Sequence, residues 1–350
     1  MRLAFPMFGV GRSGGSKVIA RLADASIRRG HSVSFLVPAQ KGVPSPGTPV
    51  EVIQVPRIPI PRDRHIVPTI MSGASFQYAK RLRGFDAVIA TYGPTCLPTK
   101  LAGDRNLKRY YIVQHDETIF FPPLTLEHWV VRLSYSAFEQ GRVFAVSKWL
   151  QDMVRKRGGP QPILLPPGID HETYRPRART PHKGKQVLAL ARDDKWRGFR
   201  VFLDAMDSVC REVKDVKIIA AGGTSWRPRT SCPIEYVHPS DNELADLYSS
   251  SDVFVLPSFL EGMPVPPLEA MACGGAVVMT DCMGNREYSL NGENCLVVPP
   301  RDPDSLAEAI VRVLADNALS ERLRRNGPPT AAPWTYERMG RIFVESIESM

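Results

Sequence analysis

The chain has 350 residues, more than one hydrophobic core usually organises, and its hydrophobic content of 43% excludes an intrinsically disordered protein. No apolar run approaches the roughly 18 residues of a membrane-spanning helix, so no such helix is expected. The charge is divided unequally, because residues 1–160 carry 23 Lys and Arg against 10 Asp and Glu (net +13), whereas residues 161–350 have a net charge of −4.

The first predicted strand, Leu3–Phe8, leads into the stretch FGVGRSGGSK, whose glycines spell G-x-G-x-x-G (Gly9, Gly11 and Gly14). Such a loop, followed here by a helix predicted over Lys17–Arg29, brings backbone N–H groups close to an anion. A dinucleotide site also needs an acid after the second strand, Val33–Val37, and none follows it. A P-loop needs its lysine one position earlier. The stretch therefore predicts either another kind of anion-binding loop or a tight turn.

The rest of the first half alternates strands with helices. The strands are apolar and β-branched without strict alternation, which is typical of parallel strands buried on both faces. They are predicted over Val50–Val55, Ala87–Thr91, Tyr110–Gln114 and Val143–Val146, with helices near Ser72–Arg83 and Leu124–Glu139. Residues 40–68 are dense in proline and arginine, which predicts either an acceptor-facing functional loop or an irregular surface excursion.

After residue 160 the same pattern restarts. The segment GGPQPILLPPGID has the glycine and proline content of a domain boundary. Strands are predicted over Gln186–Ala191, Val216–Ala221, Asp252–Leu256, Ala276–Thr280 and Cys295–Val298, with helices near Phe199–Val213, Asn242–Ser249, Pro267–Cys273 and Ser305–Ala315. Two doubly wound α/β units in tandem predict a ligand cleft at the carboxyl ends of their strands.

The most specific part of the sequence is Asp252–Ile310, which contains Glu261 and Glu269. Three prolines between the two glutamates forbid a helix that spans both. We therefore expect Glu261 in the loop after a strand, and Glu269 in the first turn of a short helix that begins at Pro266 and ends before Gly274. Two carboxylates at the carboxyl end of one sheet are suited to binding sugar hydroxyl groups.

This string, E-G-x-x-x-P-x-L-E-A-M-A-C-G-x-x-V, resembles the E-x7-E signature of the retaining, nucleotide-sugar-dependent glycosyltransferases of family 4. Further segments similar to that family follow in its order, and they cover essentially the whole chain: Gly14–Lys17, Gly30–Val33, Ala145–Val154, Leu165–Pro176, Ala191–Met206 and Pro333–Phe343. The resemblance implies the GT-B fold, in which two Rossmann-like domains with parallel sheets face each other across a deep cleft. It predicts an acceptor-binding domain over residues 1–160, a nucleotide-sugar-binding domain over 161–332, and a C-terminal helix over 333–350 that packs back on the first domain.

The resemblance also implies roles for residues of the second half. Glu269 would hold the nucleotide ribose, Glu261 would contact the transferred sugar, and the loop between them would lie beside the donor (Gly262, Met263, Pro264 and Val265). The family's R-x4-K-G pair, which neutralises the donor diphosphate, corresponds to Arg192 and Arg197, with Lys195 as a substitute or supplement. Two positions depart from the family, because Pro264 and Met283 stand where it commonly has glycine.

In the first half, Gly14 and Gly15 resemble the family's glycine pair, which approaches the donor phosphate and the acceptor. In QHDETIFF, His115 follows a strand where the family often has a histidine that touches the sugar, and Asp116 is the second candidate. A lone histidine at a strand end is a structural residue about as often as a functional one.

The resemblance implies front-face attack with retention of anomeric configuration, no protein nucleophile, no cofactor and no metal. The D-x-D that begins at Asp302 is predicted to start a helix, with Asp302 as its cap, and not to bind metal.

The expected partner is a nucleotide-sugar donor and not a nucleic acid, while the acceptor is a glycan, a lipid-linked glycan or a small molecule. The basic half favours an anionic or lipid-linked acceptor and peripheral association with the inner membrane face, unless it is simply a solvated surface. Six scattered cysteines predict reduced thiols in a cytoplasmic protein. The alternatives are a nucleotide-sugar epimerase or phosphorylase on the same fold, and a sugar- or lipid-binding protein without catalytic activity. A third alternative is a nicotinamide-dependent enzyme, although the acidic residue that would bind the ribose is missing. The oligomeric state stays open.

Overall fold

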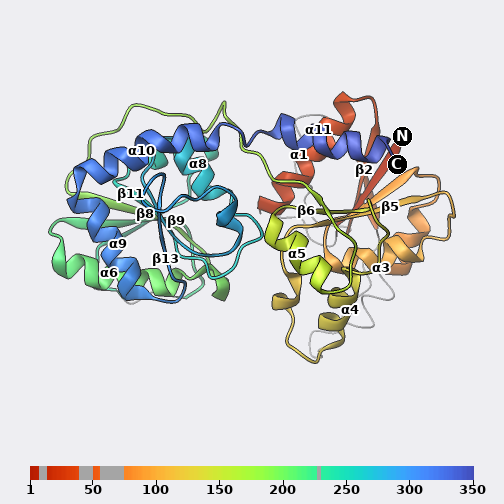
Figure 1. The fold of residues 1–350 in the computed structure, drawn as a ribbon, viewed down its shortest axis with the longest axis horizontal. Coiled ribbons are helices and arrows are strands. Elements are labelled where there is room, and N and C mark those ends of the chain that lie inside the picture. Colours follow the sequence, from red (N-terminus) through yellow and green to blue (C-terminus); the bar gives the residue numbers. More distant parts are fainter. Residues whose placement is uncertain (8–13, 39–49, 56–74, 227–229) are drawn as a thin grey trace. The chain divides into compact units, whose positions relative to one another are not determined.

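The computed structural model describes residues 1–7, 14–38, 50–55, 75–226 and 230–350, which divide into two compact units (Figure 1). Unit 1 consists of Met1–Gly168 together with Tyr336–Met350, and unit 2 is Ile169–Thr335. The boundary predicted after residue 160 therefore lies inside unit 1, and the last segment of the chain belongs to that unit. The glycines at positions 9 and 11, and most of the proline- and arginine-rich loop, fall outside the described residues.

Unit 1 is built on a parallel sheet whose described strands run in the order β3-β2-β1-β4-β5-β6-β7. The strands are β1 (Arg2–Pro6), β2 (Ser32–Pro38), β3 (Glu51–Val55), β4 (Ala87–Ala90), β5 (Lys108–Val113), β6 (Val143–Ala145) and β7 (Ile163–Leu164). The helices are α1 (Gly14–Arg28), one over residues 75–81, α3 (Gly93–Leu101), the 3-10 turn η1 (Glu117–Phe120), α4 (Leu126–Ser134), α5 (Lys148–Lys156) and α11 (Tyr336–Glu348). Helices α1 and α11 cover one face of the sheet and α3 lies on the other (Figure 1).

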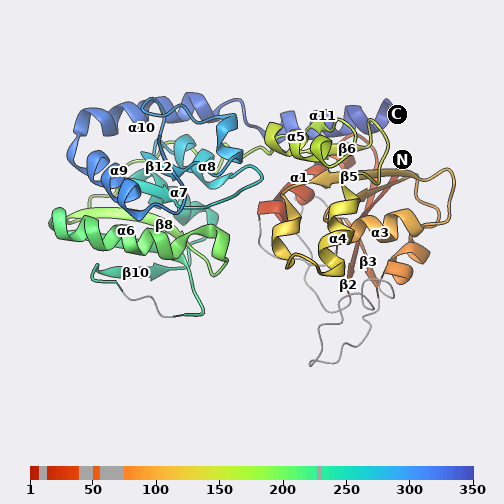
Figure 2. The same cartoon turned by 60° about the horizontal axis from the view of Figure 1, so that its bottom comes forward.

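The C-terminal helix α11 is part of the core of unit 1. Phe343 and Ile347 of this helix are fully buried, and they pack with apolar side chains of β1 and α1. Gly340 faces Ala25 of α1 so closely that any Cβ there would collide with the alanine methyl group. Close approach of two helices is a role that only glycine fills at this position. Figure 2 shows the same helix from another side.

Unit 2 has a second parallel sheet, whose described strands run β10-β9-β8-β11-β12-β13. The strands are β8 (Lys185–Ala191), β9 (Val216–Gly222), β10 (Ile234–Val237), β11 (Val253–Leu256), β12 (Val277–Thr280) and β13 (Leu296–Val298). The helices are α6 (Phe199–Glu212), α7 (Asp241–Ser250), α8 (Pro266–Ala272), α9 (Pro303–Ala315) and α10 (Asn317–Ala331), with 3-10 turns η2 (Lys195–Arg197) and η3 (Gly284–Glu287). Helices α6 and α9 cover one face, and α8 with α10 lies on the other (Figure 1).

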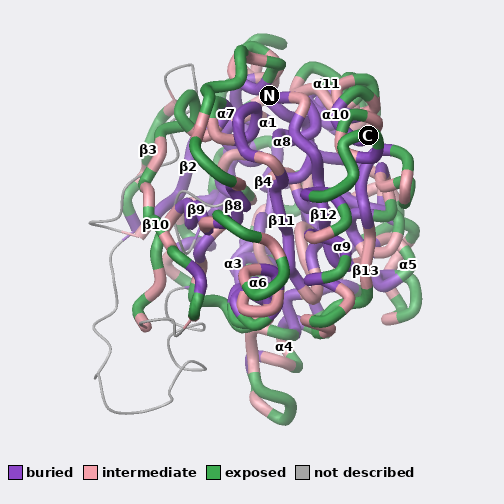
Figure 3. Tube along the Cα trace, turned by 90° about the vertical axis from the view of Figure 1, so that its left-hand side faces the viewer, coloured by how far each residue is buried: buried purple, intermediate pink, exposed green. Residues whose placement is uncertain are grey.

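Burial follows the parallel arrangement of the strands. The central strands β4, β11 and β12 are buried along their whole length, whereas the edge strands β3 and β10 are partly exposed (Figure 3). These central strands are buried on both faces, as the sequence predicted for continuous apolar strands. No helix in the described parts of the chain has both the length and the hydropathy needed to cross a bilayer.

Two sequence predictions are wrong. The helix predicted over Leu124–Glu139 is shorter, because Thr125 caps α4 through the backbone N–H of His128 and the helix ends at Ser134. The prediction that every cysteine is a free thiol fails for Cys210 and Cys232, which form a disulfide with their Cα atoms 5.8 Å apart. The other four cysteines are buried and unpaired. No local spacing could reveal the bridge, since it joins the end of α6 to the loop before β10.

Candidate functional site

The predicted donor residues of unit 2 form one group, which we name the acid–cation cluster: Arg192, Lys195, Arg197, Glu261 and Glu269. Strands β8 and β11 are neighbours in the sheet, and the chain leaves both at the same edge. The loop after β8 carries the three cations, and the loop after β11 carries Glu261 before α8 begins. The carboxyl edge of a parallel sheet is where open α/β folds bind ligands.

Arg197 and Glu261 form an ion pair, in which Nη1 of the arginine contacts Oε1 of the glutamate. Glu261 is only 5% exposed, and its backbone N–H donates to the carbonyl of Cys282 at 3.0 Å. The cation is held in place by the next residue, Gly198, which has a φ of 68° and lies so close to the carbonyl of Pro257 that a Cβ would collide with it. Arg197 therefore orients Glu261 as well as adding positive charge.

Arg192 and Lys195 have no carboxylate partner among the described residues. Burial lowers the pKa of Arg192, and the charge of Arg197 acts in the same direction, while Glu261 partly opposes them. A partly buried guanidinium that forms no ion pair is destabilised, and a bound anion would offset that cost. Lys195 is exposed on η2. These two cations are consequently better placed than Arg197 to receive a phosphate group.

Glu269 lies in the first turn of α8 and is 7% exposed, as the proline pattern predicted. The hydroxyl of Tyr248, on α7, donates a hydrogen bond to Oε2 of Glu269 at a long 3.5 Å.

In the loop before α8, the carbonyl of Pro264 accepts a hydrogen bond of 2.8 Å from the hydroxyl of Tyr288. The backbone N–H groups of Met263 and Val265 donate to no acceptor in the described parts of the chain. The loop therefore presents backbone donors beside a buried carboxylate. The hydrogen bonds that Tyr248 and Tyr288 donate to this region were not predicted from the sequence.

The backbone at Met283 is strained and lies directly against the acid-bearing loop. Met283 has φ 69° and ψ −56°, and the N–H of Gly284 donates to the carbonyl of Cys282 at 2.8 Å, which defines a tight three-residue turn of the rare kind. Glu261 and Met283 pair as an isolated parallel bridge. A Cβ at Gly284 would collide with the carbonyl of Gly262. The departure from glycine noted in the sequence thus falls on a positive-φ residue.

The predicted residues of unit 1 gather at the carboxyl edge of its sheet. Gly14 and Gly15 begin α1, and a Cβ at Gly15 would come within 3.0 Å of Oε1 of Gln114. Gln114 follows β5, and its Nε2 donates to the carbonyl of Thr91 after β4 at 3.3 Å. His115 comes next, with Nδ1 3.2 Å from the carbonyl oxygen of Asp116. The glycine pair and the histidine loop are therefore neighbours, although they are 100 residues apart.

The carboxylate of Asp116 accepts hydrogen bonds from other side chains of the protein. Its two carboxylate oxygens accept hydrogen bonds of 2.8 and 2.7 Å from the guanidinium of Arg157, which lies 5.1 Å from the ring centre of Tyr135. Thr118 donates to the same carboxylate through its hydroxyl, at 2.6 Å. Burial would raise the pKa of Asp116, but hydrogen bonds from Arg157 and Thr118 outweigh it and hold that pKa below its usual value. Asp116 is thus better suited to fixing the loop behind His115 than to contacting a sugar.

Glu117 is a buried acid that the sequence did not single out. It accepts a hydrogen bond from the backbone N–H of Gly93, and its own N–H donates to the hydroxyl of Tyr135 at 2.8 Å. Burial raises the pKa of Glu117 to about 8, although the hydrogen bond from Gly93 opposes the shift. The residue therefore anchors the loop to the start of α3 mainly as a neutral acid at neutral pH.

The pair formed by Asp116 and Arg157 gives a testable positioning effect. Replacement of Arg157 by lysine is expected to lower the transfer rate about tenfold. An ammonium group cannot form the bidentate hydrogen bonds to Asp116 that fix the loop of His115. Nucleotide affinity should stay unchanged, since the acid–cation cluster lies in unit 2. Steady-state rates and calorimetric nucleotide binding check this, with the exposed Arg155→Lys as the control. An unchanged rate would show that the loop does not need the pair.

Asp302 and Asp304 do not form part of the site. Asp302 caps α9 by accepting from the N–H of Ser305 at 3.0 Å, with Pro303 as the first helical residue, which confirms the predicted helix start. In the described parts of the chain no group of three or more His, Cys, Asp or Glu side chains is arranged to hold a metal ion.

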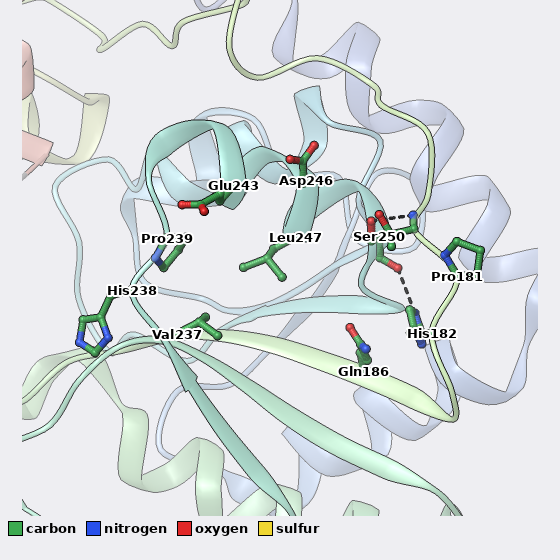
Figure 4. A pocket seen from close by; sticks show the side chains of 11 residues that line it. Pro181, His182, Gln186, Val237, His238, Pro239, Glu243, Asp246, Leu247 and Ser250 are labelled. Carbon is green, nitrogen blue, oxygen red and sulfur yellow. Dashed lines mark hydrogen bonds between the residues drawn. The ribbon is translucent and has the colours of Figure 1, made fainter.

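A cavity of about 480 Å³ beneath α7 (Figure 4) is lined by residues such as Gln186, His238 and Leu247, and by none of the predicted site residues.

Two family models match the chain in succession. The model described as Glycosyltransferase Family 4 matches residues 12–173, and the model described as Glycosyl transferases group 1 matches residues 170–329. Between them they include the glycine pair at the start of α1 and all five members of the acid–cation cluster.

Curated relatives carry glycosyltransferase names. The phosphatidyl-myo-inositol mannosyltransferase of Mycobacterium tuberculosis is 27% identical over 325 residues, which are 87% of this chain and 84% of the relative. The N,N'-diacetylbacillosaminyl-diphospho-undecaprenol alpha-1,3-N-acetylgalactosaminyltransferase of Campylobacter jejuni is 38% identical over 168 residues, 45% of this chain and 43% of the relative.

Solved structures share the fold. The sucrose-phosphate synthase of Thermosynechococcus elongatus superimposes with a TM-score of 0.83 at 19% identity, over 99% of this chain and 98% of its own. Anabaena HepE in complex with UDP and glucose gives 0.81 at 17% identity over the whole of both chains. Two parallel sheets in separate units, matched over their full length by enzymes of this kind, constitute the GT-B fold. The chain therefore belongs to glycosyltransferase family 4 and is a transferase of glycosyl groups.

Proposed function

We propose that this glycosyltransferase moves a sugar from a nucleotide diphosphate sugar to a hydroxyl group of a lipid-linked or other anionic glycan acceptor, with retention of anomeric configuration. The observation that carries the donor half of the proposal is the position of Arg192. Its partly buried guanidinium has no acid partner in the described parts of the chain, yet it stands beside the Arg197–Glu261 pair at the carboxyl edge of the sheet. A diphosphate supplies the missing negative charge.

The nucleoside is assigned to Glu269, the acid in the first turn of α8. Glu269 is buried at the start of that helix, where a carboxylate can accept two hydrogen bonds from the adjacent hydroxyl groups of a ribose. Glu261 is oriented by Arg197 and lies in the loop before it, so the transferred sugar is assigned to Glu261 and to the backbone N–H groups of Met263 and Val265. The order of contacts along the donor is then ribose, diphosphate and sugar.

The chemistry follows from where charge develops. As the bond from the anomeric carbon to the phosphate oxygen breaks, negative charge grows on the diphosphate and positive charge on the sugar ring. Arg192 and Lys195 stabilise the former, and each fixed cation contributes a few kcal/mol to lowering the barrier. The acceptor oxygen bonds to the anomeric carbon on the face that the phosphate leaves, and its proton passes to the departing phosphate oxygen. Attack on that face preserves the configuration without a protein nucleophile or a metal ion.

The acceptor half of the proposal rests on charge and on the relatives. The net charge of +13 over residues 1–160 favours a phosphate-bearing acceptor presented at the inner face of a membrane. The names of two relatives specify a phosphatidylinositol and an undecaprenyl diphosphate substrate, and both are lipids with phosphate groups. In unit 1, His115 and the glycine pair at the start of α1 are the residues assigned to the transferred sugar and the acceptor.

A two-step experiment tests the proposal. We expect one of UDP, GDP and dTDP to raise the melting temperature of the purified protein at millimolar concentration, with or without EDTA. The matching nucleotide sugars, added with extracted lipid-linked glycans, should then yield a product whose anomeric proton coupling in NMR equals that of the donor. Inverted coupling overturns retention, consumption of donor without acceptor points to an epimerase, and no shift with any nucleotide overturns the donor assignment.

A further inference from the structure

An apolar surface in unit 1 lies on α4 and the loop before it. Leu126, Trp129 and Leu133 are 55%, 48% and 63% exposed. Their spacing of three and four residues places them on one face of the helix. The loop adds Leu124, which is 90% exposed, and the 3-10 turn η1, which contacts α4, adds Ile119, which is 37% exposed. We name these five side chains the α4 face. Soluble proteins seldom gather so many large apolar groups on one exposed helix without a binding function.

The backbone holds this surface outward. Leu124 has a φ of 75°, a conformation that is costly for a residue with a branched side chain, and it follows two prolines in the sequence. The opposite side of α4 anchors the helix through buried Glu127, Val131 and Ser134. Strain at an exposed leucine favours a functional reason for its position. In Figure 1, α4 and its loop lie at the margin of unit 1, away from the sheet.

The exposed charge on α4 itself is positive. Over residues 118–138, all of which the structure describes, the only acidic side chain is Glu127, and it is buried. Arg132 is exposed on α4, with its guanidinium 5.8 Å from the ring centre of Trp129. Lys100 of α3 has its ammonium 4.9 Å from the ring centre of Phe138. Tryptophan and leucine with an adjacent arginine are typical of helices that lie in the membrane interface.

We propose that the α4 face docks unit 1 on the anionic surface of a lipid bilayer, with Leu124, Trp129 and Leu133 inserted among the acyl chains and Arg132 among the headgroups. The inference deepens the proposed function and rests on it for a lipid-linked acceptor. Charge complementarity favours the bilayer over a second copy of the chain, because a symmetric contact across this face would bring each Arg132 near its equivalent within two basic units. A bilayer with anionic headgroups meets the same surface with opposite charge.

Vesicle binding tests the proposal. The purified full chain is sedimented with phosphatidylcholine vesicles that contain either no anionic lipid or about 30% phosphatidylglycerol. We expect binding to the anionic vesicles, quenching of tryptophan fluorescence by brominated acyl chains, and weaker binding at high salt. The double variant W129S/L133S should lower the partition coefficient at least about tenfold and abolish most of the quenching, since two large apolar groups no longer insert. The matched control is Leu290→Ser in unit 2, whose leucine is also 63% exposed.

The outcomes separate this inference from the proposed function. Both variants should keep the wild-type melting shift with nucleotide, which reports the donor site alone. Equal partitioning of wild type and the double variant overturns the docking surface, even if nucleotide binding and transfer are intact. Light scattering without lipid gives a further test. If the wild type is a dimer and the double variant is a monomer, the α4 face mediates self-association and the bilayer proposal is wrong. Loss of the nucleotide shift in wild type instead refutes the proposed function.

Discussion

Replacement of Glu269 by glutamine is expected to weaken the binding of the nucleoside diphosphate by roughly ten- to hundredfold, because hydrogen bonds to an ionised group contribute about 1.5–3 kcal/mol. Glutamine keeps the size of the side chain and its position in the first turn of α8, so the change removes charge and one acceptor without opening a cavity. Isothermal titration calorimetry with the nucleotide found in the melting screen measures the effect.

The matching change at Glu261 should separate the two acids. Glu261→Gln is expected to leave nucleotide affinity within about threefold and to lower the transfer rate by about a hundredfold, because its assigned contact is to the transferred sugar, where charge develops. Glu293→Gln is the control for each, since Glu293 is an exposed acid of the same unit. Unchanged nucleotide affinity in the Glu269 variant would show that the ribose is bound elsewhere.

The placement of these acids could be predicted from the sequence because local covalent geometry determines it. Prolines between Glu261 and Glu269 exclude a continuous helix, and Pro266 begins α8 where the structure has it. The departure at Met283 was also visible, since a residue other than glycine stood at a glycine position. That Met283 occupies a positive-φ turn against the loop of Glu261 follows only from the packed structure.

The supports of the site could not be predicted, because long-range packing produces them. Arg157 follows α5 in a run of basic residues that resembles a solvated helix end, yet its guanidinium holds Asp116 of a loop 41 positions earlier. Tyr248 has the pattern of a core aromatic, and its contact with Glu269 depends on α7 packing against α8. Charge runs and buried aromatics have many partners available in a fold, and a single sequence does not choose between them.

Helix α10 was missed for a related reason. Its last turns contain Gly327, Pro328 and Pro329, which normally interrupt a helix. The glycine is needed there, because a Cβ at Gly327 would come within 2.8 Å of the carbonyl oxygen of Met271 on α8. The close contact between α8 and α10 thus overrides the local preference for a break. It also brings a second arginine of a basic run, Arg324, into the interior.

Replacement of Arg324 by methionine is expected to destabilise unit 2 by about 3 kcal/mol and to lower its melting temperature by roughly 6–12 °C. Arg324 is 8% exposed, and its guanidinium donates to four backbone carbonyls: those of Ser249, Ser251, Asp252 and Gly274, at 3.4, 2.5, 3.1 and 3.0 Å. These carbonyls lie at or just beyond the C-terminal ends of α7 and α8, where the helix leaves acceptors unsatisfied and a cation is favoured. Methionine fills the space and leaves all four without their donor.

Two further variants make the result specific. Arg325→Met, which removes an exposed arginine from the other side of the same helix, should change stability by less than about 0.5 kcal/mol. Arg324→Lys should fall between, because burial already lowers the pKa of this arginine to about 10 and a lysine ammonium with three donors cannot reach all four carbonyls. Hydrogen exchange should show faster opening at the ends of α7 and α8 in the methionine variant while α1 and α11 stay protected. Equal melting of the Arg324 and Arg325 variants would mean that water satisfies these helix ends as well as the guanidinium does.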